Sequence, residues 1–262
     1  MQNEPKPDLF DVLLRVGGFA VVGFVVLIAA SGNSLDDFTR SALAVFASGL
    51  AANLLIVTKF ERGRFSDFGL GWPPRYCAAG FAQGAVALGA VVGTALVLGL
   101  AAFAPTVADH SLLLTILLIL MGVLGEEMLF RGYAFQYLAR EWNASITIVA
   151  FGILFGLVHL FNNNVQPIGA ANTALWGCLL GYACVRGRSL WLPTGIHFGW
   201  NLALTLFTSN LSGLTIRATA WELRWSGSEL WSGGNYGVEG GLLATIVALP
   251  VFLLVRRIRS MR

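Results

Sequence analysis

The chain has 262 residues, of which 56% are hydrophobic and 12% are charged, and its formal net charge is +3 at pH 7. A soluble domain carries about twice that fraction of charged residues, so the composition excludes an ordinary soluble protein and indicates an integral membrane protein. The basic residues form no run with interleaved aromatic side chains, which argues against nucleic acid as a partner.

Eight apolar segments are long enough, some of them loosely, to form membrane-spanning helices, which need about 20 residues each. They cover residues 12–30, 40–58, 76–103, 111–140, 144–161, 168–186, 190–208 and 239–256. The acidic Glu4, Asp8 and Asp11 precede the first segment, whereas a signal peptide begins with positive charge, so this segment is interpreted as a retained anchor. The sequence therefore predicts an all-α membrane protein with eight transmembrane helices, forming one polytopic domain over residues 1–262.

The basic residues are concentrated at the N-terminus and in alternate loops. One side of the predicted bundle holds Lys6, Lys59, Arg62, Arg64, Arg75, Arg140, Arg186, Arg188, Arg256, Arg257, Arg259 and Arg262. The opposite loops hold only Arg40, Arg217 and Arg224. Because basic loops stay in the cytoplasm, both termini are predicted to be cytoplasmic. Lysine is scarce relative to arginine, which is typical of a GC-rich bacterial genome, so we expect the protein in a bacterial inner (cytoplasmic) membrane.

A Trp-rich segment, residues 209–238, lies between the last two predicted spans, on the outer side. Trp221, Glu222 and Trp225 alternate between apolar and polar character. The segment is interpreted as an amphipathic helix lying on the outer leaflet. The alternative is a lid over a cavity.

Within the fourth predicted span, the letters GEEMLFRG follow a long aliphatic run and place Glu126, Glu127 and Arg131 at its end. An ionisable residue inside a bilayer costs about 2.5–3.5 kcal/mol on insertion scales, so it is retained mainly where it has a function. Glu127 and Arg131 are four residues apart on one helix and are predicted to form an ion pair. Glu126 is turned by about 100° from Glu127, which leaves it free to face another helix.

Two further spans each carry a polar stripe. Phe155 and His159 share one helix face, and so do His197 and Asn201. Helical rise places Glu126 and His159 level with each other in a predicted antiparallel pair of helices. A carboxylate in apolar surroundings suits a general base, and histidine or amide groups can orient a water molecule or donate to an oxyanion. The cluster therefore predicts a hydrolase that needs no serine or cysteine nucleophile.

The three motifs EEMLFRG, FGLVH and HFGWN occur in this order on hydrophobic spans. They resemble the EExxxR, FxxxH and HxxxN motifs of the CAAX protease and bacteriocin-processing family of intramembrane proteases. The direct resemblance covers roughly residues 120–202, within a motif-bearing core of four helices over about 111–208. The eight-helix layout is similar to that of the CAAX prenyl endopeptidases. The resemblance implies hydrolysis of a peptide bond in a membrane-associated peptide or protein, with or without a lipid modification.

The resemblance also implies roles for single residues. Glu126 would activate the water, His159 would help to hold it, and His197 and Asn201 would bind the oxyanion or complete the water site. Glu127, Arg131 and Phe155 would support these four residues. No cofactor is expected. Zinc is the alternative, because two histidines and a glutamate leave an open coordination position, but the His-Glu-His spacing of soluble zinc proteases is absent.

Two other functions use the same residues. A proton-coupled transporter also carries buried carboxylates and histidines, although it predicts repeated halves with broken helices, which the sequence does not show clearly. A non-catalytic scaffold would have lost a motif residue, and all are present. For the protease, we expect the cavity to open toward the cytoplasm, with Gly195 and Gly199 leaving room for a peptide beside His197.

Overall fold

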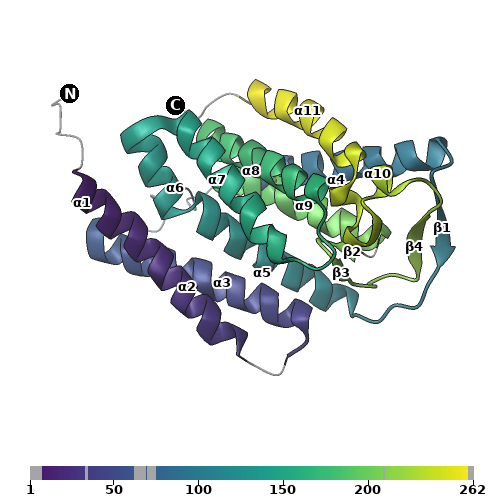
Figure 1. The fold of residues 1–262 in the computed structure, drawn as a ribbon, viewed down its shortest axis with the longest axis horizontal. Helices are drawn as coiled ribbons and strands as arrows, with labels where there is room; N and C mark the ends of the chain where they lie inside the picture. The colour runs from purple at the N-terminus through teal and green to yellow at the C-terminus, as the bar shows by residue number, and fades with distance from the viewer. Residues whose placement is uncertain (1–7, 33–34, 62–68, 70–74, 209, 259–262) are drawn as a thin grey trace.

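The computed structural model describes residues 8–32, 35–61, 69, 75–208 and 210–258. Lys6, Arg62, Arg64, Arg259 and Arg262, which enter the predicted orientation, lie outside these described residues. The longer helices run roughly side by side along the long axis of the molecule, and α1 lies at one end of it (Figure 1). The helical elements of the described chain are α1 (Leu9–Val12), η1 (Leu13–Gly17), α2 (Gly18–Ser31), α3 (Asp37–Ile56), η2 (Val57–Glu61), α4 (Arg75–Val97), α5 (Leu112–Arg131), α6 (Tyr133–Leu138), η4 (Ala139–Asn143), α7 (Ala144–Val158), η5 (His159–Phe161), α8 (Pro167–Gly187), α9 (Trp191–Thr208), α10 (Glu229–Ser232), η6 (Gly234–Tyr236), η7 (Val238–Gly240) and α11 (Leu242–Arg257).

Five helical segments among the described residues are long and apolar enough to cross a membrane. They are Leu9–Ser31, Asp37–Phe60, Arg75–Val97, Leu112–Phe161 and Pro167–Gly187. The fourth has 50 residues, which is about 75 Å at the helical rise of 1.5 Å per residue and too long for a single crossing. It contains α5, α6, η4 and α7, and the chain turns back between η4 and α7 (Figure 1). The structure fits an all-α membrane protein, and the number of eight crossings stays a prediction.

The predicted third span, 76–103, ends early. Helix α4 stops at Val97, and Gly99 follows with a φ of 67°, a backbone conformation that glycine adopts without strain. The chain then forms strand β1 (Ala101–Pro105).

The interpretation of the 209–238 segment as an amphipathic helix is wrong. The segment contains strands β2 (Asn210–Leu211), β3 (Leu214–Thr215) and β4 (Trp221–Trp225), besides the short α10 and η6. Strand β4 pairs antiparallel with β1, with Trp225 opposite Ala101 and Trp221 opposite Pro105. The alternation of apolar and polar residues in WELRW has a period of two, which is the period of a strand.

Glycines bring α4 and α9 into close parallel contact. A Cβ on Gly84 would overlap the carbonyl oxygen of Ile196, and a Cβ on Gly199 would overlap that of Phe81. Gly195 meets the backbone of Cys77 in the same way. The helix backbones can approach this closely because glycine has no side chain. The space beside Gly195 and Gly199 is therefore filled by α4, and the expectation that it holds a substrate peptide is wrong.

The buried apolar core lies mainly between α4, α8, α9 and α11. Its most enclosed side chains include Leu88, Leu180, Leu192, Ile196, Leu204 and Val255. This packing holds α9, which carries His197 and Asn201, against the rest of the bundle.

The predicted fourth span, 111–140, breaks directly after the EEMLFRG motif. Helix α5 ends at Arg131, and Gly132 has a φ of −72° and a ψ of −144° before α6 begins at Tyr133. Asn53 on α3 bridges the break: its Nδ2 donates to the carbonyl of Met128 (2.8 Å) and its Oδ1 accepts from the amide of Tyr133 (2.9 Å). A buried asparagine thus satisfies backbone groups that the break leaves without helical partners.

Candidate active site

Glu127 and Arg131 form a buried ion pair on α5, as the spacing predicts. The Arg131 Nη1 lies 3.0 Å from Glu127 Oε1, and both side chains are only 1% exposed. Arg131 Nη2 also donates to the carbonyl of Gly177 on α8 (2.9 Å), and its guanidinium lies 4.6 Å from the centre of the Phe155 ring. Arg131 therefore connects α5, α7 and α8 at the level of the motif.

His197 lies between the two glutamates. Its Nδ1 is 2.9 Å from Glu127 Oε1, and its Nε2 is 3.7 Å from Glu126 Oε2. Because a carboxylate oxygen only accepts, Nδ1 carries a proton that it donates to Glu127. Glu127 thus orients both Arg131 and His197, so its role extends beyond the predicted pair with Arg131.

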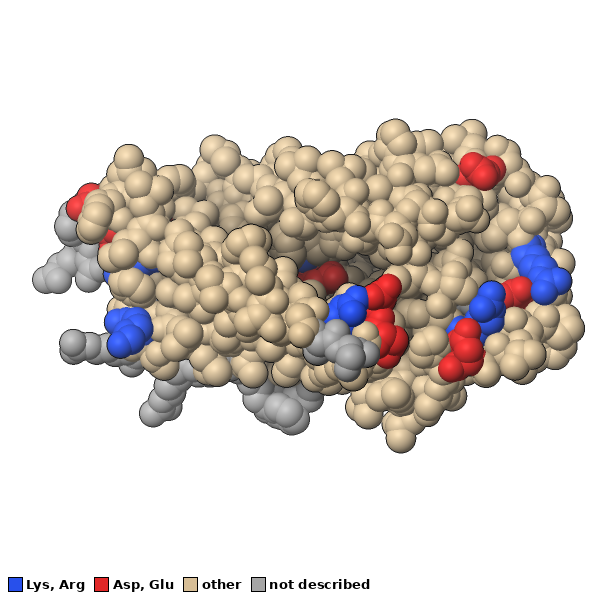
Figure 2. Space-filling model, turned by 60° about the horizontal axis from the view of Figure 1, so that its bottom comes forward, with Lys and Arg blue, Asp and Glu red and all other residues tan. Residues whose placement is uncertain are grey.

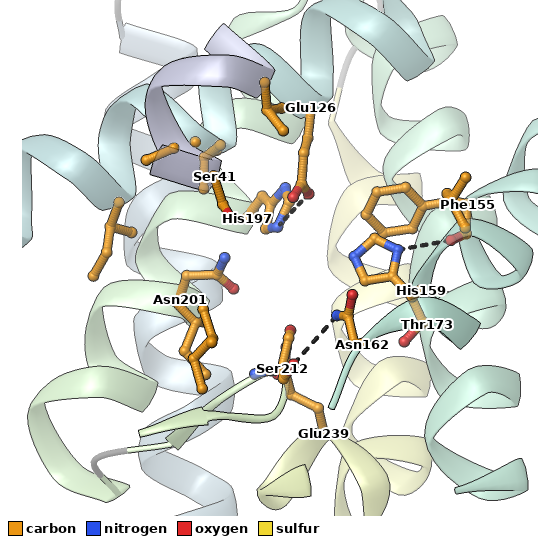
Figure 3. Close-up of a pocket in the computed structure, with 18 of the residues that line it drawn as sticks. Ser41, Glu126, Phe155, His159, Asn162, Thr173, His197, Asn201, Ser212 and Glu239 are labelled. Carbon is orange, nitrogen blue, oxygen red and sulfur yellow. Dashed lines mark hydrogen bonds and ion pairs between the residues drawn. The ribbon is translucent and has the colours of Figure 1, made fainter. Parts of the chain in front are cut away.

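Glu126 is far less buried than Glu127, with 27% of its side chain exposed. It points into a cavity, as does His197 beside it (Figure 3). The predicted division of the two glutamates, one paired within the helix and one facing another helix, agrees with this geometry.

His159 begins η5 at the end of α7. Its Nδ1 lies 2.7 Å from the carbonyl oxygen of Phe155, which can only accept a hydrogen bond. A neutral imidazole then carries its proton on Nδ1 and leaves Nε2 as an acceptor. The Phe155 ring packs 4.4 Å from that of His159 and 6.2 Å from that of His197. Phe155 therefore separates the guanidinium of Arg131 from the cavity and supports both histidines.

Asn201 lies one helical turn beyond His197 on α9. Its amide points toward the same cavity (Figure 3), and its Oδ1 is buried without a hydrogen-bond partner. An unpaired buried amide oxygen costs free energy, which a water molecule or a substrate N–H at this place would recover. The structure therefore brings Glu126, His159, His197 and Asn201 to one cavity.

The helix neighbours differ from those predicted. Helix α5 packs against α3 and α9, whereas α7 packs against α8, so α5 and α7 are not the expected antiparallel pair. They touch through the rings of Phe130 and Phe155, whose centres are 4.9 Å apart. The cavity between these helices has a volume of about 730 Å³.

The cavity is bounded by residues far from the end of the bundle where α1 lies. Its walls include Phe24 and Leu27 near the end of α2, Ser41 near the start of α3, and Phe161 at the end of η5. Figure 2 shows a hollow on the side of the molecule, with an acidic side chain inside it and charged side chains beside it. The cavity opens sideways rather than at the end of the bundle where α1 lies. The expected opening toward the cytoplasm depends on the orientation in the membrane, which stays a prediction.

Two ring nitrogens remain available in the cavity. Among the described residues, no group of three or more His, Cys, Asp or Glu side chains is placed to hold a metal ion. The Nδ1 of His197 is engaged by Glu127, and the Nδ1 of His159 by Phe155, so the Nε2 of each histidine is left to contact a water molecule or a substrate. The same pattern occurs in histidines that bind zinc, so zinc stays the alternative.

Several residues around the site are absent from the sequence-based prediction. Asn53 and the carbonyl of Gly177 support the motif of α5, while Asn162, Ser212 and Glu239 line the far part of the cavity. The sequence offers one indication of the role of Asn53, since it is a polar amide residue inside a predicted membrane span. The others lie outside the motifs: Asn162 follows η5, α8 carries Gly177, and residues 210–241 bring Ser212 and Glu239 to the site.

Residues 108–203 match the model of a protein family described as type II CAAX prenyl endopeptidase Rce1-like. The predicted site residues Glu126, Glu127, Arg131, Phe155, His159, His197 and Asn201 all fall in this range. The match confirms the resemblance to the CAAX proteases and indicates a membrane protease of that kind. No curated protein matches the chain.

Proposed function

We propose, from the match of its core to the type II CAAX prenyl endopeptidases, that the protein is an intramembrane endopeptidase in which Glu126 activates a water molecule. The observation that carries this proposal is the position of His197 between Glu126 and Glu127, at the wall of a cavity that also holds His159 and Asn201. The substrate is a membrane-associated peptide or protein.

The first step forms a tetrahedral intermediate. A water held by the Nε2 of His159 gives a proton to Glu126, and its oxygen bonds to the carbonyl carbon of the substrate. The carbonyl oxygen becomes an oxyanion, which the amide N–H groups of Asn201 stabilise. His197 adds a donor when its Nε2 is protonated, because Glu127 accepts from its Nδ1 and shares the positive charge.

The second step breaks the peptide bond. The oxyanion collapses, the carbon–nitrogen bond breaks, and Glu126 returns its proton to the leaving amine. The products are a new carboxyl end and a new amino end, and Glu126 is again a carboxylate. Glu127, Arg131 and Phe155 touch none of the reacting atoms in this scheme and act by positioning His197 and His159.

The test compares the wild type with Glu126→Gln. Both proteins are purified in detergent and assayed on membrane-anchored peptides, some with a prenylated C-terminal cysteine and some without. We expect the variant to lose at least about 100-fold in turnover, because glutamine cannot take the proton of the water. Equal turnover in the two proteins would refute the role of Glu126.

Glu141→Gln is the matched control. Glu141 lies in η4, where it pairs with Arg140 rather than lining the cavity. It undergoes the same chemical change as Glu126→Gln and should keep wild-type turnover. Dialysis of the wild type against a chelator should also leave the turnover unchanged, whereas a loss that zinc restores would favour the metal alternative.

The same assay separates the competing functions. A non-catalytic scaffold would cleave no peptide, and a proton-coupled transporter would acidify vesicles in a Glu126-dependent manner without cleavage. The ordered match of all three motifs favours the protease.

A further inference from the structure

The cavity continues beyond the catalytic cluster to a second carboxylate, Glu239. This residue lies in η7, close to the turn between β2 and β3, and lines the same cavity as Glu126 (Figure 3). None of the reaction steps above uses it.

Two hydrogen bonds hold the Glu239 carboxylate in place. The backbone N and the Oγ of Ser212 each donate to Glu239 Oε2 at 2.8 Å. Ser212 itself adopts a φ of 47°, which is uncommon for a residue other than glycine. Its carbonyl accepts from Asn162 Nδ2 (3.2 Å), and Asn172 Nδ2 donates to the backbone carbonyl of Glu239 (2.8 Å). The carboxylate is thus fixed from two sides.

The charge of Glu239 is not neutralised by the protein. No basic side chain of the described residues lies within ion-pair distance of it, and its Oε1 makes no hydrogen bond within them. Of the other carboxylates lining the cavity, Asp37 pairs with Arg40, and Glu126 lies beside His197. A fixed carboxylate in a partly enclosed space favours a cation, because little water is present to screen it.

We propose that Glu239 forms a substrate subsite that binds a cationic side chain, lysine or arginine, near the bond that the Glu126-activated water attacks. This inference rests on the proposed function, because a subsite presupposes a peptide substrate. Binding of the cationic side chain can nevertheless be measured without cleavage. The polar groups around Glu239, among them the Thr173 hydroxyl and the Asn162 amide, give the subsite acceptors for the remaining N–H groups of such a side chain. A carboxylate at this place repels an acidic side chain or a free C-terminal carboxylate.

The test measures binding to the full chain with Glu126→Gln, in lipid nanodiscs, so that no peptide is cleaved. The probes are fluorescent apolar nonapeptides, acetylated and amidated, in which one lysine is moved through the positions and compared with glutamine and glutamate. We expect lysine to bind about tenfold more tightly than glutamine at one position at least, the scale of a charge-assisted hydrogen bond. Glutamate at that position should bind more weakly than glutamine.

A second substitution, Glu239→Gln, should abolish the preference for lysine. The glutamine oxygen still accepts both bonds from Ser212, so the loop keeps its shape while the charge is removed. Glu229→Gln is the matched control, since Glu229 is an exposed residue of the same outer region that does not line the cavity. No preference for lysine at any position, or a preference that survives Glu239→Gln, would overturn the proposal.

Cleavage of the same peptides by the wild type is scored separately. Cleavage without a preference for lysine would refute the subsite and leave the protease standing. A lysine preference that depends on Glu239, without any cleavage, would refute the protease and leave the subsite standing.

Discussion

The adjacent glutamates of α5 lie in opposite environments. Glu127 is sealed in the bundle with Arg131, and its Oε2 is buried without a hydrogen-bond partner. Glu126 borders the cavity, where water can reach it. The same substitution at the two positions should therefore have different physical consequences.

We predict that Glu127→Gln lowers the thermal stability of the protein, whereas Glu126→Gln does not. Without Glu127 the buried guanidinium of Arg131 has no counter-charge, and breaking a buried ion pair costs about 3–5 kcal/mol. The melting temperatures of both variants, measured in one detergent by intrinsic fluorescence, check this. Equal melting temperatures in the two variants would contradict the assignment of separate roles.

A double variant distinguishes charge from packing. In Glu127→Gln with Arg131→Gln, both buried charges are removed, so part of the lost melting temperature should return. If the double variant is less stable than Glu127→Gln alone, the shape of the pair matters more than its charge.

For single residues, the sequence predicts those contacts that lie within one helix. The pair of Glu127 with Arg131 follows from a spacing of four residues. The contact of His197 with both glutamates does not, because it depends on how α9 packs against α5. No motif marks Glu239, because residues 210–241 reach the cavity only through the folding of the chain.

Among the elements, the contact between α4 and α9 fixes the position of His197 and Asn201. Gly80 and Gly84 on α4 face Gly195 and Gly199 on α9, so each helix presents two small residues at a spacing of four. This spacing is visible in the sequence and predicts a close helix contact. Which helices form it is not visible, and the expected substrate space was in fact the backbone of α4.

We predict that Gly199→Ala destabilises the bundle and lowers activity. Its new methyl group would overlap the carbonyl of Phe81 and push α4 from α9, and overpacking of this kind costs about 1–3 kcal/mol. Gly93→Ala is the matched control on α4, because nothing lies within 4 Å of its added Cβ. Melting temperatures and turnover of both variants give the comparison, and similar losses in the two would argue against a special role for this contact.

The element boundaries show where the sequence misleads. Apolar composition extends past Val97, but Gly99 turns the chain into β1. The segment around β4 forms a strand instead of the expected helix, in agreement with the period of two in WELRW. Helix α5 ends at Gly132, a break that Asn53 supports from α3. These features depend on partners distant in the chain, whereas the apolar helices themselves follow from composition.

For the whole molecule, the distribution of arginine and the position of the cavity together predict the depth in the membrane at which the substrate is cleaved. With both termini on the cytoplasmic side, the start of α3 and the end of α7 lie in the outer half of the membrane, and the cavity opens sideways there. A substrate held in the bilayer would reach Glu126 through that side opening. We therefore propose that cleavage occurs in the outer half of the bundle.

Single cysteines test this orientation. Ser41 is exposed, lines the cavity and lies four residues after the start of α3, whereas Ser145 is exposed near the start of α7 at the opposite end. In a background with Cys77, Cys178 and Cys184 changed to alanine, Ser41→Cys should react with a membrane-impermeant maleimide in spheroplasts. Ser145→Cys should react only in inside-out vesicles.

The activity of the labelled proteins adds a second, independent readout. A maleimide attached at Ser41→Cys would occupy the cavity and should block cleavage, while the same group at Ser145→Cys lies outside that cavity and should leave turnover unchanged. Labelling of Ser41→Cys only from the cytoplasmic side, with Ser145→Cys labelled from outside, would invert the predicted orientation and put the cleavage site in the inner half. In the structure α3 and α7 start at opposite ends of the bundle, so the two cysteines should lie on opposite sides of the membrane. Labelling of both cysteines from the same face would contradict this arrangement.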